Sequence, residues 1–315
     1  AGGNEYFKNG DTADSGATGT YEDHSAYYDT AGELWLNNLE AHTIKANGNL
    51  TIYVCNNQET NTNIVTATQN ETAIEVTGYL TIRYGGYGGG TGSLTVESDG
   101  KEAIQAGSGM TVSDGVEVKV RAKSGATAIS SGGVLKIDGI RTKLEAAGDG
   151  STGKGIFAQQ SIYVKNSAVL TAFGGAAAYE SPSGIDKSGY GYEDYNVFTG
   201  DAAPGTQAAK DTVLNGYKYI RIEPTGVANV KTLTELQAAA QNQYISLINV
   251  MNDITITDTV YVRRAVTIQS PDASNVSKLI RGKSHTDVIL DFDGANGHKS
   301  DVVTLKNIIV DGNKD

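Results

Sequence analysis

The chain has 315 residues, 39% of them hydrophobic and 19% charged, which is enough apolar material for one or two folded domains. Acidic residues outnumber basic ones by 36 to 25, and the net charge of −11 argues against nucleic acid or an anionic membrane as a partner. No apolar run is long enough to span a bilayer, and the single cysteine, Cys55, excludes an intrachain disulfide.

An apolar pattern repeats through the first 175 residues at spacings of 30, 30, 25 and 27 residues. The repeat starts with an isoleucine in each copy: Ile44, Ile74, Ile104, Ile129 and Ile156. Six residues later stands a second apolar residue: Leu50, Leu80, Met110, Leu135 and Ile162. Eight residues later stands a third: Ile52, Ile82, Val112, Ile137 and Val164. Apolar residues two apart indicate a strand with one buried face.

A further apolar column belongs to the same repeat, and its members are Leu34, Ile64, Leu94, Val118, Leu144 and Leu170. Each copy therefore holds three short strands joined by glycine-rich turns. One such coil buries little by itself, but stacked coils place every apolar column in a continuous core. The sequence predicts an all-β fold, a right-handed parallel β-helix (solenoid) of three-strand coils with a period of 24–30 residues. Thr51, Thr81 and Thr111 should face solvent.

The range 174–212 breaks the repeat, and we expect a loop excursion there with one irregular turn at Ile185. A strand at 217–222 should close the first domain, which we assign to 1–224. Tyrosine combines an apolar ring with a polar tip and suits stacking on sugars. The candidate ligand-binding residues are therefore Tyr84 and Tyr87 in one turn, and Tyr190, Tyr192, Asp194 and Tyr195 in the excursion. The simpler alternative is that these rings pack on their own coil.

The remaining range, 225–315, has the pattern of the start of a second β-helix. Thr232 and Glu235 form a capping box for a short helix that should end near Asn242. Apolar strand runs follow at 244–250, 254–257, 266–269, 288–292 and 302–310. Because no cap follows the last run, we expect this domain to be truncated and its open C-terminal end to self-associate or to be frayed over about its last 30 residues.

Two stretches carry a resemblance to known families. The repeats at 48–52, 78–82 and 109–112 resemble glycine-rich repeats of large surface proteins from anaerobic Gram-positive bacteria. The segments 233–238, 252–256 and 304–312 are similar to the pectin-lyase-like right-handed β-helices of adhesins. The resemblance implies a modular protein outside the cell, on its surface or wall. That superfamily includes lyases, hydrolases and non-enzymatic adhesins, so fold alone does not decide function.

Acids and bases suited to lyase or hydrolase chemistry occur in the second segment. They are Asp287, Asp291, Asp293, Asp301 and Asp311, with Arg263, Arg264, Arg281 and Lys283. Most stand in or beside turns, where acids commonly cap the backbone, and no spacing fixes two carboxylates on one strand face. We therefore assign no catalytic residue. The leading hypothesis is a non-enzymatic surface module that binds glycan or a host protein through its loops. The alternative is a polysaccharide lyase or glycoside hydrolase whose site lies partly outside these residues.

The sequence predicts no cofactor, although one calcium pattern remains open. Asp311, Asn313 and Asp315 stand at alternate positions, as in the opening of a calcium loop. A simple turn after a strand explains the same residues, because no bidentate acid follows.

Overall fold

The computed structural model describes residues 5–7, 25–29, 31–55, 62–86, 91–187, 193–262, 264–292 and 302–312. The chain divides into two compact units. The first comprises Ala1–Gly189 and Asn196–Glu223, and the second comprises Tyr190–Tyr195 and Pro224–Asp315. Nearly all regular structure in the described residues is β, arranged as stacked parallel coils with one short helix. No helix among these residues is long and apolar enough to cross a membrane.

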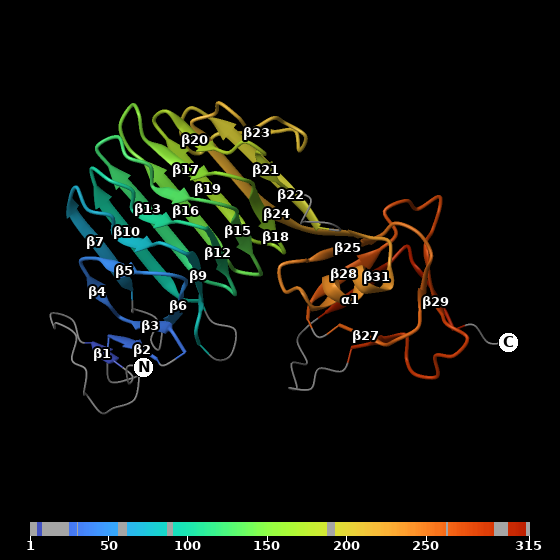
Figure 1. Cartoon of the computed structure of the whole chain (residues 1–315). Coiled ribbons are helices and arrows are strands. Elements are labelled where there is room, and N and C mark those ends of the chain that lie inside the picture. Colours follow the sequence, from blue (N-terminus) through green and yellow to red (C-terminus); the bar gives the residue numbers. More distant parts are fainter. Residues whose placement is uncertain are drawn as a thin grey trace. The chain divides into compact units, whose positions relative to one another are not determined.

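The first unit is a β-solenoid whose coils each add a strand to three sheets (Figure 1). The isoleucine column lies in sheet C, where the five isoleucines are Cα partners in successive strands. The strands of sheet C are β5 (Ile44–Ala46), β8 (Ile74–Val76), β11 (Ile104–Ala106), β14 (Ile129–Ser131), β17 (Lys154–Ala158) and β20 (Ala177–Glu180). Ile74, Ile104, Ile129 and Ile156 are fully buried, so this predicted column is confirmed.

Sheet A contains the second and third columns in the predicted register. Its parallel strands are β3 (Glu33–Asn37), β6 (Leu50–Cys55), β9 (Tyr79–Tyr84), β12 (Gly109–Ser113), β15 (Leu135–Asp138), β18 (Ile162–Lys165) and β21 (Ile185–Asp186). Two antiparallel strands, β1 (Glu5–Phe7) and β2 (Ala26–Tyr28), precede β3 in the sheet. Thr51, Thr81 and Thr111 are adjacent partners between the buried columns and are partly exposed, as predicted.

Sheet B confirms the last column only from Leu94 onward. In the first unit its parallel strands are β4 (Glu40–Ala41), β7 (Asn63–Gln69), β10 (Ser93–Asp99), β13 (Glu117–Lys123), β16 (Lys143–Gly148) and β19 (Val169–Gly174). The predicted place of Leu34 is wrong, because Leu34 lies in sheet A opposite Ile52. The predicted place of Ile64 is also wrong, because Asn63 is the register partner of Leu94 and Ile64 points the other way.

Asn63 explains this register shift. Its side chain is fully buried, although it stands in an apolar column. The amide oxygen accepts the Leu39 backbone N–H at 3.0 Å, and the amide nitrogen donates to the Ser93 carbonyl at 3.2 Å. The side chain thereby links three consecutive coils, and these bonds offset the cost of burying the amide.

The range assigned to a loop excursion, 174–212, contains regular strands in its described part. Strands β20 and β21 continue sheets C and A, and Ile185 pairs with Ile162. Strands β22 (Glu193–Gly200) and β23 (Thr206–Ala208) then form an antiparallel hairpin. The next strand, β24 (Tyr219–Val230), pairs antiparallel with β19 through its first residues and parallel with β25 through its last.

The second unit begins with the predicted helix. The helix α1 (Leu233–Gln241) has Thr232 as N-cap and the expected capping box with Glu235, and Asn242 is its C-cap. Stacked coils follow, with strands β25 (Leu247–Val250), β26 (Ile254–Ile256), β27 (Val260–Tyr261), β28 (Val266–Gln269), β29 (Lys278–Arg281), β30 (Leu290–Asp291), β31 (Val303–Lys306) and β32 (Ile309–Asp311). Strands β27 and β29 were not predicted from the sequence, because they are short and include polar or charged residues.

The core of the second unit weakens in its last described coil. Ile268 is fully buried, whereas its register partner Leu305 is 42% exposed. Leu279 is likewise fully buried, whereas its partner Val310 is 43% exposed. In the described residues no coil covers Leu305 and Val310, so side chains of the inward columns meet solvent here.

Candidate functional site

The predicted ligand-binding residues belong to different parts of the chain. Tyr87, Tyr190 and Tyr192 lie outside the described residues. Tyr84 is the last residue of β9 in the first unit, whereas Asp194 and Tyr195 belong to the second unit at the start of β22. The Tyr195 backbone N–H donates to the Asp194 carboxylate at 3.1 Å, and both side chains are partly buried. Their role in binding therefore stays a prediction.

A neighbouring acid, Glu193, connects this segment to the end of helix α1. Glu193 is only 6% exposed, and its carboxylate accepts a hydrogen bond from the Asn242 side chain at 2.8 Å. Asn242 is the C-cap of α1. The predicted segment therefore docks, through Glu193, against the C-terminal end of the helix.

The same end of α1 borders a pocket of about 470 Å³. The residues that line it are Ala240, Gln241, Gln243, Tyr261 and Arg264. Helix α1 contributes Ala240 and Gln241, the following turn contributes Gln243, and β27 contributes Tyr261. Gln241 and Gln243 are exposed, and Tyr261 is 43% exposed. Exposed polar side chains and an aromatic ring thus meet at one concave place.

Arg264 lines this pocket and is held by backbone carbonyls. Its Nε donates to the Ala240 carbonyl at 3.1 Å and its Nη2 to the Ala239 carbonyl at 2.7 Å. Its Nη1 donates to the carbonyls of Ile245 and Ala265. A cation at a helix C-terminus satisfies the last carbonyls and interacts favourably with the helix dipole. Burial lowers the pKa of Arg264 from its ordinary value.

From the sequence, Arg264 was only a candidate base. Its partners Ala239 and Ala240 precede it by 25 and 24 residues, and they contribute main-chain oxygens. A residue pattern does not reveal contacts to the backbone. Neither the hydrogen bonds of Arg264 nor the pocket could therefore be predicted from the sequence.

The candidate acids do not assemble into a site in the described structure. Asp293, Asp301 and Arg263 lie outside the described residues, as do Asn313 and Asp315 of the calcium pattern. Among the residues that are described, no group of three or more His, Cys, Asp or Glu side chains is placed to hold a metal ion. Asp291 is the register partner of Tyr261, which places this acid beside the pocket on the adjacent strand.

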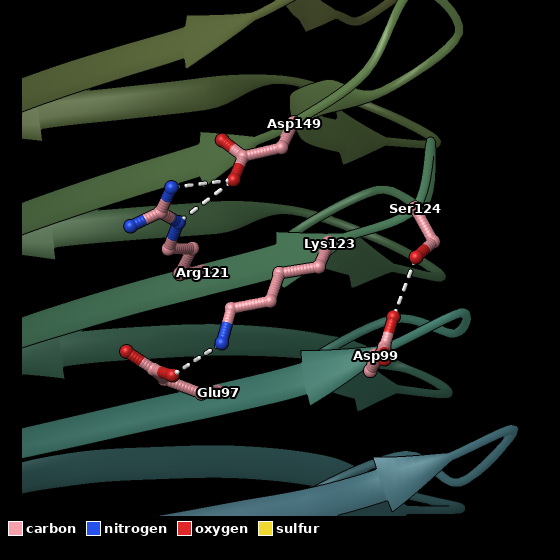
Figure 2. Close-up of polar contacts among 6 residues, drawn as sticks. All are labelled: Glu97, Asp99, Arg121, Lys123, Ser124 and Asp149. Carbon is pink, nitrogen blue, oxygen red and sulfur yellow. Dashed lines mark hydrogen bonds and ion pairs between the residues drawn. The ribbon is translucent and has the colours of Figure 1, made fainter.

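The outer face of sheet B has a dense set of charges, but they pair with one another (Figure 2). Lys123 on β13 contacts Glu97 on β10 at 3.1 Å, and Arg121 donates twice to Asp149 beyond β16, at 2.8 and 2.6 Å. These pairs join coils that are adjacent in the stack. Such exposed pairs contribute about 0–1 kcal/mol each, and their opposite charges balance, so this face offers little to a charged ligand.

Comparison with known proteins gives one family match. Residues 227–315 match a family described as "putative pectate lyase-like adhesive domain". No curated protein and no solved structure matches the chain. The matched range includes α1, the pocket and every strand from β25 to β32, and it fits a pectin-lyase-like β-helix. The match suggests an adhesive surface module.

Proposed function

We propose that this chain is a non-enzymatic module of an extracellular protein, attached to the cell surface or wall, that binds a glycan or a host surface protein. The observation that carries the proposal is the match of residues 227–315 to an adhesive domain. The stacked coils of the first unit support it, because a solenoid built from nearest-neighbour contacts is a long scaffold that displays its turns.

The ligand-contacting residues in this proposal are Tyr84 at the end of β9, Asp194 and Tyr195 in β22, and three tyrosines outside the described residues, Tyr87, Tyr190 and Tyr192. Tyrosine supplies a large contact area and a hydroxyl at small entropic cost. The docking of Glu193 on Asn242 supports a fixed position for the start of β22, since a buried hydrogen-bonded carboxylate resists displacement.

The test is binding of the 315-residue chain to a glycan array and to a panel of host surface proteins. We expect saturable binding that falls when Tyr190, Tyr192 and Tyr195 are all replaced by alanine, with the thermal midpoint unchanged. Tyr163→Ala is the matched control, because Tyr163 is an outward aromatic residue on β18, outside the proposed site. A large loss of stability in the triple variant would instead identify these rings as packing residues.

The enzymatic alternative makes a different prediction in the same samples. A polysaccharide lyase or glycoside hydrolase would release unsaturated products or new reducing ends from acidic and neutral polysaccharides. Turnover above that of a heat-denatured sample would replace the adhesive proposal. Binding without turnover supports it, and the absence of both would leave a structural spacer.

A further inference from the structure

We propose that the pocket at the C-terminal end of α1 binds one sugar ring of a neutral glycan, with Gln241, Gln243 and Tyr261 in contact with it. The inference rests on the proposed glycan-binding function and adds to its tyrosine contacts a further contact site with a stated ligand class. A volume of about 470 Å³ lies within the range of about 300–1,000 Å³ that is usual for small-molecule pockets.

The engagement of Arg264 argues against an acidic ligand. An arginine recognises a carboxylate or phosphate best through two parallel N–H donors on one edge of the guanidinium. Here Nε, Nη1 and Nη2 all donate to backbone carbonyls around the helix end. An acidic group could form a bidentate pair with Arg264 only by breaking bonds that hold the end of α1.

The remaining lining groups match the chemistry of sugar hydroxyls. A carboxamide both donates and accepts hydrogen bonds, as a hydroxyl does, and Gln241 and Gln243 present two of them at the exposed rim. Tyr261 adds a half-exposed ring with a polar tip, a combination suited to a ring that has apolar faces and hydroxyl edges.

The experiment uses ligand-observed NMR on the 315-residue chain. The probes are the methyl glycosides of glucose, galactose, mannose and N-acetylglucosamine, and the methyl glucuronide serves as the acidic counterpart of the glucoside. We expect at least one neutral glycoside to bind, and the glucuronide to bind more weakly than the glucoside. Tyr261→Ala should weaken the binding roughly tenfold, which corresponds to the loss of one aromatic contact and one hydrogen bond.

Tyr244→Ala is the matched control, because Tyr244 is 40% exposed but does not line the pocket. It should leave the affinity unchanged, and Gln241→Ala combined with Gln243→Ala should reduce it. Tyr261→Phe keeps the ring and should retain more affinity than Tyr261→Ala, which separates lost contact from a local folding defect.

The outcomes separate this inference from the proposed function. Binding that is lost in Tyr195→Ala but kept in Tyr261→Ala would overturn the pocket assignment and leave the adhesive function standing. Tighter binding of the glucuronide than of the glucoside would refute the argument from Arg264. Binding to host proteins alone would overturn the inference only, and no binding to any glycan or host protein would overturn both.

Discussion

Replacement of Ile104 by aspartate should destabilise the solenoid severely. Ile104 is fully buried between Ile74 and Ile129 in sheet C, so a carboxylate there has apolar neighbours above and below. Loss of the buried side chain costs about 1.5–3 kcal/mol. Keeping the new acid neutral at pH 7, three units above its ordinary pKa, costs about 4 kcal/mol more. The total of roughly 6 kcal/mol approaches the whole stability of a typical domain, about 5–15 kcal/mol.

The assay is the thermal midpoint by circular dichroism at pH 7 and pH 4. Burial raises the folded-state pKa of the new carboxyl above its unfolded value, so the penalty is smallest below about pH 4 and grows as the pH rises. Ile104→Asn, which does not titrate, should show no such trend. Thr111→Asp should cost far less, because Thr111 is partly exposed and pairs with Lys136 in the next coil. Similar midpoints for Ile104→Asp and Thr111→Asp would refute the coil register.

Four further predictions concern other parts of the chain. Asn63→Leu should lower the thermal midpoint although the two side chains are similar in size. The free energy of unfolding should fall by about 2 kcal/mol, because backbone groups lose their hydrogen-bond partners. A midpoint at or above that of the wild type would contradict the role of Asn63. Thr232→Ala should cost about 1 kcal/mol through loss of the helix cap, measured by denaturant unfolding. Burial raises the pKa of the Cys55 thiol to about 11. The folded protein should therefore resist thiol labelling at pH 8 and lose stability as the pH rises from 9 to 11. Rapid labelling would place Cys55 at the surface. Leu305→Lys together with Val310→Lys should suppress the concentration-dependent self-association of the chain in analytical ultracentrifugation, because both side chains are exposed apolar groups of the last described coil. Equal self-association of this double variant and the wild type would exclude the last described coil as the contact.

The sequence predicted the solenoid because each coil repeats the same offsets between inward apolar residues. Ile74, Leu80 and Ile82 are separated by six and eight residues, as are their counterparts in the next coils, and all three are fully buried. The prediction failed where a polar side chain occupies an inward position. Asn63 is such a residue. The apolar Ile64 beside it was placed in the column instead, which shifted the predicted register by one residue.

The helix and the pocket show the same contrast in the second unit. Thr232 and Glu235 carry a local signal three residues apart, so the start of α1 was predictable. The pocket depends on Arg264 reaching backbone oxygens about 25 residues earlier, and on Tyr261 from a two-residue strand. Neither contact leaves a periodic or compositional trace in the sequence.

The constant register of the coils makes their number a variable that evolution can change in whole units. Removal of residues 104–128 would join Ala103 to Ile129 and bring Ile129 onto Ile74, where Ile104 now lies. Leu135 would then take the place of Met110 opposite Leu80, because both follow their isoleucine by six residues. Recombination between neighbouring repeats can therefore add or remove a coil of the first unit without disturbing its core. The number of coils can thus change while the residues of any binding site stay the same.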